Sequence, residues 1–249
     1  MNKFCALILA AGKGTRMKSD LAKALHVLEG KSLLYYSIAA AQAAGAEKVV
    51  VIIGHEAEKV RELFADTGVI FVEQKPQLGT GHAVLQAKAA LANYQGLTVI
   101  LCGDLPLLSS ATIENLVAGH LSSKAQITVL TTFPPLLEGY GRVVKDGSGN
   151  VMKIVEERDA TEAEKQIGEI NTGIYCVHTP FLFKALGKVT NDNNQKEYYL
   201  TDIVEIAGLE GLSVKAHIAP DYIEVMGINT PEELSIASKH LPTNRKQSD

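Results

Sequence analysis

Residues 4–25 read FCALILAAGKGTRMKSDLAKAL, and this stretch indicates the class of the fold. Phe4 to Leu9 form an unbroken apolar run, as expected for a strand that is covered on both faces of a parallel sheet. Small residues and glycines follow, and they allow a turn whose backbone approaches a ligand closely. The cations of the stretch, which suit phosphate groups, are Lys13, Arg16, Lys18 and Lys23. The stretch therefore predicts a first strand that opens into a phosphate-binding turn.

Two familiar phosphate motifs do not match this turn. No Gly-Lys-Ser/Thr sequence closes it, as a Walker A loop requires. The dinucleotide fingerprint also fails, because Arg16 stands two positions beyond Gly14 and no third glycine follows in the required register. This mismatch disfavours a dehydrogenase domain. A lone Gly-x-Gly also occurs in ordinary tight turns, so the assignment depends on other segments.

The alternation of short apolar runs with helical periodicity predicts an α/β fold. We expect a Rossmann-like class with a mostly parallel central sheet flanked by helices. The expected strands are Phe4 to Leu9, Lys48 to Ile53, Val69 to Val72, Thr98 to Cys102, Ile127 to Thr132, Val151 to Val155 and Gly173 to His178. The expected helices are Leu33 to Ala44, Glu56 to Phe64, Thr80 to Leu91, Ala111 to Leu121, Pro180 to Leu186, Tyr199 to Gly208 and Pro231 to His240. Beyond about Pro134 the spacing changes, which predicts a smaller lobe that continues the same domain.

Composition narrows the classes of protein. A formal net charge of -4 with scattered lysines and arginines argues against a nucleic-acid partner. No segment offers the about 20 apolar residues of a membrane span. The cysteines are Cys5, Cys102 and Cys176. They are widely spaced, without a Cys-x-x-Cys pattern, and fit a reduced, cytoplasmic compartment. We expect one domain over residues 1–241 and a polar tail over residues 242–249.

An acidic residue follows another predicted strand. Residues 101–108 read LCGDLPLL, and Asp104 stands where the strand ends. Ligands of open parallel sheets lie at the carboxyl ends of strands, so Asp104 is expected to face the same crevice as the first turn. One such carboxylate suffices for magnesium, which takes its other ligands from water and phosphates. The alternative is an Asp that caps the helix near Ser109.

A third segment, residues 74–83, reads QKPQLGTGHA. The amides of Gln74 and Gln77 can read the edge of a base, although an amide alone does not discriminate bases because it donates and accepts equally. His82 begins a predicted helix, where packing or capping is the simpler interpretation. His26 and His55 stand in no arrangement that suggests nucleophilic catalysis.

Eight segments resemble a known family in order and spacing. They are LAAGKGTRM, LGTGHA, CGDLPLL, GYGRVV, IVEERDAT, EINTGIY, EYYLTDIV and GINTPEEL. Together they resemble N-acetylglucosamine-1-phosphate uridylyltransferase over roughly residues 4–241. The resemblance covers the uridylyltransferase half of a usually bifunctional family, without the acetyltransferase β-helix. A free-standing uridylyltransferase and a part of a longer bifunctional protein both stay open.

The resemblance implies roles for individual residues. Uridine contacts would come from Leu9, Ala10, Ala11, Gly12, Gln74, Gly79, Thr80 and Gly103. Arg16 and Lys23 would hold the triphosphate and act with Asp104 in catalysis. Asp104 and Asn229 would bind magnesium, although the pattern around Asn229 also fits a helix cap or turn. Sugar contacts would come from Gly141, Glu156, Asn171, Tyr198 and Thr201, although an aromatic pair at a helix start also suits a core. Glu157 is expected to point away from the sugar if it shares a strand with Glu156.

The activity implied is magnesium-dependent transfer of UMP from UTP to N-acetylglucosamine 1-phosphate, which gives UDP-N-acetylglucosamine and pyrophosphate for cell-envelope synthesis. Two alternatives stay open. One is thymidylyl or cytidylyl transfer to another sugar 1-phosphate, and the other is a catalytically silent nucleotide-sugar sensor. A homo-oligomer and a separate acetyltransferase partner are compatible with the sequence, which decides neither.

Overall fold

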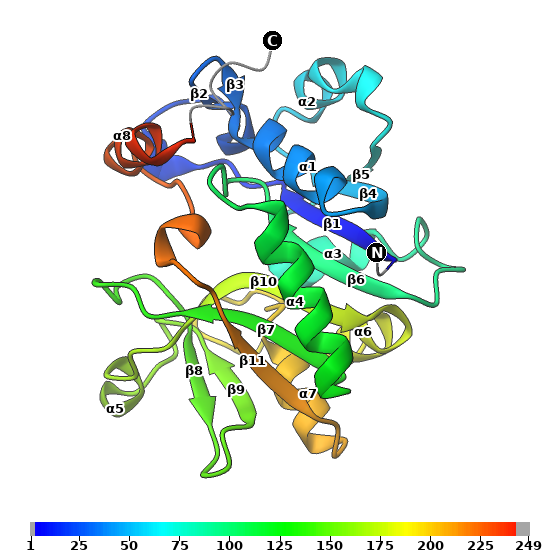
Figure 1. The fold of residues 1–249 in the computed structure, drawn as a ribbon, viewed down its shortest axis with the longest axis vertical. Coiled ribbons are helices and arrows are strands. Elements are labelled where there is room, and N and C mark those ends of the chain that lie inside the picture. The colour runs from blue at the N-terminus through cyan, green and yellow to red at the C-terminus, as the bar shows by residue number, and fades with distance from the viewer. Residues whose placement is uncertain (1–2, 243–249) are drawn as a thin grey trace.

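The computed structural model describes residues 3–242, and its framework is a nine-stranded sheet. The strand order is β11-β7-β10-β6-β1-β4-β5, with β8 paired to β10 and β9 paired to β8. β1 is parallel to both β4 and β6, whereas β10 runs antiparallel to β6 and β7. The sheet is therefore mostly parallel, as predicted, with one reversed strand inserted near its middle (Figure 1).

The strands are β1 (Phe4–Ala10), β2 (Val27–Leu28), β3 (Lys31–Ser32), β4 (Ala46–Ile53), β5 (Ile70–Glu73), β6 (Leu97–Cys102), β7 (Ile127–Thr132), β8 (Arg142–Lys145), β9 (Val151–Val155), β10 (Ile170–His178) and β11 (Val214–Ile218). The α-helices are α1 (Leu33–Ala43), α2 (Ala57–Leu63), α3 (Thr80–Gln86), α4 (Ser110–Ser123), α5 (Glu162–Lys165), α6 (Thr179–Leu186), α7 (Asp202–Leu209) and α8 (Pro231–His240). The short 3₁₀ helices are Thr15–Met17, Lys23–Leu25, Ala65–Thr67 and Tyr222–Val225.

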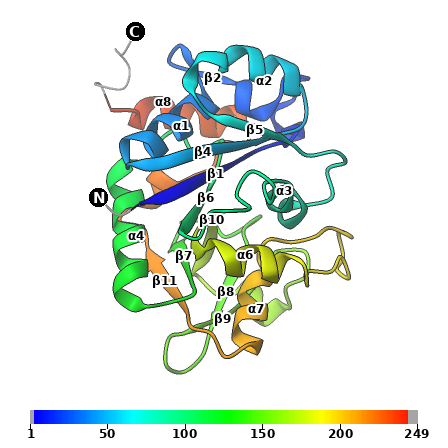
Figure 2. The same ribbon diagram turned by 90° about the vertical axis from the view of Figure 1, so that its right-hand side faces the viewer.

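Alternating side chains of β1 divide the core into two layers. Phe4, Ala6 and Ile8 face one apolar cluster, while Cys5 and Leu7 face the other. The first cluster includes residues of α1 and α4, and the second includes residues of α3, α6 and α7. Figure 2 shows α4 on one side of the sheet and α3, α6 and α7 on the other. Because both faces are covered, the unbroken apolar run at residues 4–9 is the expected pattern for this strand.

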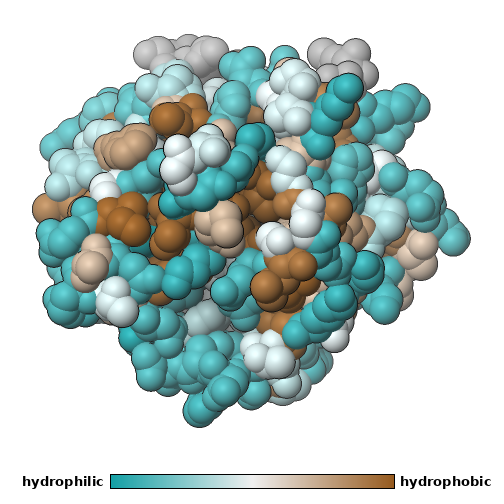
Figure 3. All heavy atoms as spheres, turned by 90° about the horizontal axis from the view of Figure 1, so that it is seen from below, coloured by the Kyte–Doolittle hydropathy of each residue, from teal (hydrophilic) through white to brown (hydrophobic). Residues whose placement is uncertain are grey.

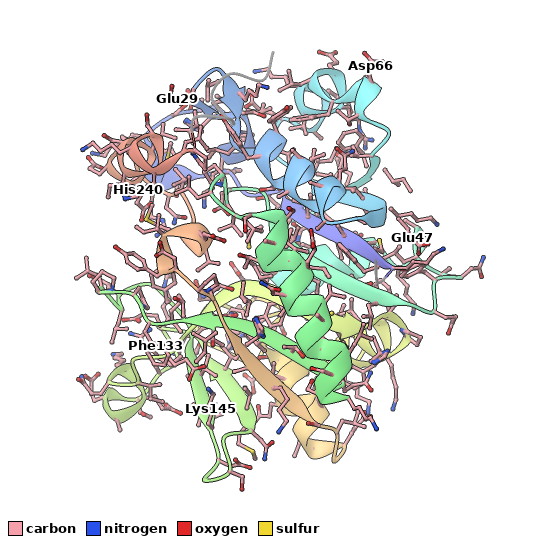
Figure 4. The ribbon with its side chains drawn as sticks, viewed as in Figure 1. Glu29, Glu47, Asp66, Phe133, Lys145 and His240 are labelled. Atoms are coloured by element: carbon pink, nitrogen blue, oxygen red, sulfur yellow. The ribbon has the colours of Figure 1, made fainter. Side chains whose placement is uncertain are left out.

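The smaller lobe is built around the antiparallel pair β8 and β9. Lys145 of β8, labelled in Figure 4, lies 2.5 and 2.6 Å from the two carboxylate oxygens of Glu169. This ion pair joins the ribbon to the segment before β10. Figure 3, which views the molecule from this end, shows small apolar areas separated by hydrophilic residues. In residues 3–242, no helix is both long and apolar enough to cross a membrane.

Some predicted elements differ in the structure. β8 and β11 were not expected, because a Gly-rich GYGR segment and a short polar alternation give weak strand signals. α3 ends at Gln86 instead of Leu91, and the chain continues in turns in which Lys88 N donates to Leu85 O. α7 begins at Asp202 instead of Tyr199. Apart from residue 242, the predicted polar tail lies outside the described residues.

Candidate active site

A pocket opens beside the carboxyl ends of β1 and β5. Its volume is about 270 Å³. It is lined by Leu9, Ala11, Gly12, Gln74, Gln77, Gly79, Thr80, Ala83 and Glu197. Most of the predicted uridine contacts therefore meet in one cavity, although they come from two separate segments of the chain, residues 9–12 and 74–80. Sequence reasoning did not assign Glu197 or Ala83 to this pocket.

Two predicted nucleotide contacts, Ala10 and Gly103, are not among the residues that line this pocket. Gly103 N donates to Leu9 O at 2.8 Å, which continues the pairing of β6 with β1. A Cβ on Gly103 would lie 3.1 Å from the Cβ of Ala10 and from Leu9 O, closer than an ordinary contact, so glycine suits this close approach of the two strand ends. In this structure both residues shape the backbone that presents Leu9 and Ala11.

Two of the cations expected to serve the phosphates, Arg16 and Lys23, converge with the proposed magnesium ligands. The ammonium group of Lys23 donates to Oδ2 of Asp104 and, at 2.5 Å, to Oδ1 of Asn229. Nη2 of Arg16 donates to the same Asn229 oxygen at 2.8 Å. Positions 16, 23, 104 and 229 therefore form one polar cluster, which is defined here as the cation cluster. Its side chains come from the first turn, the end of β6 and the segment before α8.

The helix caps exclude the capping alternatives for Asp104 and Asn229, although Asn229 does make the local contact of a turn residue, because its Nδ2 donates to Gly227 O at 3.0 Å. Ser109, not Asp104, caps α4, because its side chain accepts from Thr112 N. Thr230, not Asn229, caps α8 in a reciprocal capping box with Glu233. The side chains of Asp104 and Asn229 are therefore available to the cation cluster.

The predicted sugar contacts form a second group. Thr201 Oγ1 donates to Glu156 Oε1 at 3.1 Å, and a Cβ on Gly141 would meet Glu156 Oε2 at 3.4 Å. Asn171 N donates to Gly141 O at 2.9 Å, which holds the two segments together. Burial raises the pKa of the Glu156 carboxyl, and the hydrogen bond from Thr201 opposes this shift. This group can offer a carboxylate, an amide and a backbone N–H to a polyhydroxylated ligand.

Tyr198 occupies a different position from the other sugar candidates. Its backbone pairs with residues 74–83, here called the base-side loop, because Gly81 N donates to Tyr198 O and Tyr198 N donates to Leu78 O, both at 2.8 Å. Its ring lies 6.4 Å from the ring of His82 and lines a second cavity of about 320 Å³. Tyr198 therefore connects the base-side loop, through its backbone, to the segment that carries Thr201.

Sequence reasoning missed two residues of the GYGR segment. Arg142 is only 2% exposed and forms an ion pair with Glu157 at 2.8 Å. The expectation for Glu157 depended on a strand shared with Glu156, and this condition is not met because β9 ends at Val155; Glu156 accepts from Thr201, whereas Glu157 pairs with Arg142. Burial raises the pKa of Tyr140, and the charges of Glu233 and Asp104 act in the same direction. The sequence signal that could have found these residues was their position directly beside the proposed sugar contacts Gly141 and Glu156.

The residues around Asp104 and Asn229 fit a magnesium ion by their chemistry. One carboxylate oxygen and one amide oxygen converge on the Lys23 ammonium, so this point already favours positive charge. A Cβ on Gly227 would lie 3.4 Å from Asp104 Oδ2, so glycine leaves room beside these oxygens. Within residues 3–242 there is no group of at least three His, Cys, Asp or Glu side chains that could hold a metal. Two protein oxygens match a magnesium site that is completed by phosphates and water.

Comparisons with known proteins give the family. A family model described as MobA-like NTP transferase domain matches residues 6–143. The chain belongs to this family. As a MobA-like NTP transferase domain, it contains the first turn, the base-side loop and Asp104 within the matched range.

Relatives extend the similarity over the remaining sequence. The chain is 48% identical over 240 residues to a "Bifunctional protein GlmU" from Geotalea daltonii, covering 96% of this chain and 52% of that protein. It is 48% identical over 237 residues to the protein of that name from Lactococcus lactis, covering 95% and 51%. A relative of the same name from Desulfotalea psychrophila is 45% identical over 246 residues, covering 99% and 73%. The chain thus spans about half the length of the first two relatives and more of the third.

Proposed function

We propose that this NTP transferase domain transfers UMP from UTP to N-acetylglucosamine 1-phosphate in a magnesium-dependent reaction. The products are UDP-N-acetylglucosamine and pyrophosphate, used for cell-envelope precursors. The observation that carries the proposal is the convergence of Lys23, Asp104 and Asn229 on one point. A base-sized pocket and a carboxylate-containing sugar group accompany this cluster. The similarity to relatives that share the name "Bifunctional protein GlmU" supports the same nucleotidyl transfer step.

The reaction needs positioning and charge neutralisation more than proton transfer. An oxygen of the sugar phosphate attacks the α-phosphorus of UTP, and the bond from that phosphorus to the bridging oxygen breaks as pyrophosphate leaves. The nucleophile is already an anion, so no general base is required. The main barrier is the repulsion between two phosphates and the charge that develops on the leaving oxygens.

The residues of the cation cluster suit this task. Lys23 and Arg16 would place positive charge on the triphosphate and its leaving pyrophosphate. Asp104 and Asn229 would hold magnesium, which when bound supplies positive charge between the two substrates. In the structure, Asn229 contacts both Arg16 and Lys23, so it also fixes the spacing of these two cations.

The other two groups would select the substrates. The pocket beside Leu9 and Gln74 would take the uracil and ribose, with glycines that allow close backbone approach. Glu156 would accept hydrogen bonds from sugar hydroxyls, and the Asn171 amide can both donate and accept. The Thr201 hydrogen bond would orient the Glu156 carboxylate toward the sugar.

The test is pyrophosphate release by the purified protein. UTP, dTTP and CTP would each be combined with N-acetylglucosamine 1-phosphate, glucose 1-phosphate and glucosamine 1-phosphate, with magnesium and with a chelator. We expect strong preference for UTP with the acetylated sugar, and loss of activity with the chelator. Activity on another pair would reject the substrate assignment. No release from any pair by folded protein would reject the activity and favour a nucleotide-sugar sensor.

A further inference from the structure

The orientation of the Gln74 amide is fixed by its neighbours. Gln74 is 5% exposed and lines the pocket proposed for the base. Its Nε2 donates to Gly79 O at 3.0 Å. A carbonyl oxygen can only accept, so the atom of Gln74 that faces Gly79 is the nitrogen and not the oxygen.

The second N–H of the same amide faces His82. Gln74 Nε2 lies 3.0 Å from Nδ1 of the His82 ring. If Nδ1 carries a lone pair, both N–H groups of the amide are satisfied. A buried N–H left without an acceptor would be costly, so the contact favours the tautomer with its proton on Nε2.

A second amide lies on the other side of the ring. Gln86 Nε2 lies 3.1 Å from His82 Nε2 and donates to His82 O at 3.0 Å. A neutral imidazole accepts at only one of its nitrogens, so it cannot accept from both amides. Gln74 is buried, whereas Gln86 is half-buried and its nitrogen already has the backbone acceptor. The accepting nitrogen is therefore Nδ1, and the contact with Gln86 is not a hydrogen bond in this tautomer.

We propose that His82 is a positioning residue for base selection. It holds the Gln74 amide by one of its N–H groups. The remaining polar atom of the amide is Oε1, which is an acceptor, and Gln74 lines the pocket. Uracil and thymine present an N–H donor at N3, whereas cytosine presents a lone pair there. A fixed acceptor therefore favours uracil over cytosine, and a freely rotating amide would not. His82 does not line the base pocket, so it acts through Gln74.

This inference rests on the proposed function, and its test compares the ratio of kcat/KM for UTP and CTP at a fixed concentration of N-acetylglucosamine 1-phosphate. His82→Leu removes the acceptor, and we expect the UTP/CTP ratio to fall by about fivefold or more, as for one lost buried hydrogen bond. His82→Asn can place Oδ1 near the position of Nδ1, so we expect it to retain most of the preference. His240→Leu changes a histidine on exposed α8, which Figure 4 places at the opposite end of the molecule from β8, and it should keep the wild-type ratio.

The outcomes separate the two proposals. A wild-type protein without UTP preference would overturn the proposed function and the role of His82 together. A wild-type protein that prefers UTP, with an unchanged ratio in His82→Leu, would overturn the role of His82 alone. If His82→Leu does not fold, His82→Gln carries the same expectation, because its longer side chain moves the amide away from the Nδ1 position. A loss of overall rate with an unchanged ratio would indicate a structural role and would also overturn the inference.

Discussion

The guanidinium of Arg142 lies 2.8 Å from the carboxylate of Glu157, and both residues directly follow proposed sugar contacts. Arg142 also donates to Tyr140 O and, at 3.3 Å, to Lys165 O. The buried guanidinium thus ties the segment before Gly141 to the segment after Glu156. A charge that is almost fully buried needs this partner, because desolvation without a counter-charge is costly.

Weakening the ion pair between Arg142 and Glu157 should weaken the binding of the sugar substrate. In Glu157→Gln, a neutral amide replaces the carboxylate, and we expect KM for N-acetylglucosamine 1-phosphate to rise by about fivefold while KM for UTP changes little. Steady-state kinetics with each substrate varied in turn measures both constants. Glu162→Gln is the matched control, because Glu162 forms an exposed ion pair with Lys165 on α5. Equal changes in the two KM values would contradict a local effect on the sugar group.

The cation cluster should carry most of the catalytic effect. We expect Asp104→Ala and Lys23→Ala each to lower kcat/KM by roughly a hundredfold or more. This fall corresponds to a loss of transition-state stabilisation on the order of 3 kcal/mol. The reason is that both contribute charge where the phosphates are proposed to meet. Lys88→Ala, at an exposed lysine after α3, is the control and should have near wild-type activity. Near-normal turnover in either cluster variant would refute its role.

Two glycines of the pocket should respond differently to alanine. Gly79 has φ +108, and a Cβ there would lie 2.7 Å from Tyr198 O, so Gly79→Ala should destabilise the loop by about 1–3 kcal/mol. At Gly12 a Cβ meets nothing within 4 Å, so Gly12→Ala should fold normally but obstruct the pocket that it lines. Thermal unfolding and UTP binding, measured on both variants, distinguish the two effects. Normal UTP affinity in Gly12→Ala would place the nucleotide elsewhere.

A buried histidine should make the fold sensitive to acid. His120 is 1% exposed, Thr128 Oγ1 lies 2.9 Å from its Nδ1, and the ring of His178 lies 5.2 Å away. Burial, together with the charge of His178, lowers the pKa of His120 to about 4. The folded state therefore favours neutral His120, and this stability is present above pH 6.5 and is lost as the pH falls toward 4.

His120→Gln removes the titration and keeps a polar side chain. Between pH 7 and pH 4 the free energy of unfolding should fall by on the order of 2 kcal/mol more in wild type than in the variant. Denaturant titrations at several pH values measure this difference. His240→Gln, on exposed α8, should follow the wild-type pH dependence. Parallel curves for wild type and His120→Gln would show that other groups cause the acid sensitivity.

Much of the architecture is determined locally, and so the sequence predicts it. The apolar runs at residues 4–9 and 127–132 indicate buried strands, the pattern at residues 231–240 indicates a helix, and β7 and α8 match their predicted bounds. The same holds for the turn after β1, where glycines and cations stand together. β8 was not predicted because it is a short strand, RVVK, directly after the Gly-rich GYG residues, and it is formed by pairing with β9 and β10.

The sequence alone determined the α/β class and the residue types available for phosphates, a base and a sugar, because periodicity and side-chain chemistry are local properties. Tertiary structure decided which alternatives hold. Asp104 and Asn229 each had a plausible capping role, and only the fold shows Ser109 and Thr230 in those roles. Parallel β1 and β6 end at one edge of the sheet, which brings the first turn beside Asp104, and Ile228 N donates to Asp104 O at 3.0 Å, which brings Asn229 to the same place. Contacts of this kind depend on long-range packing, which no local pattern encodes.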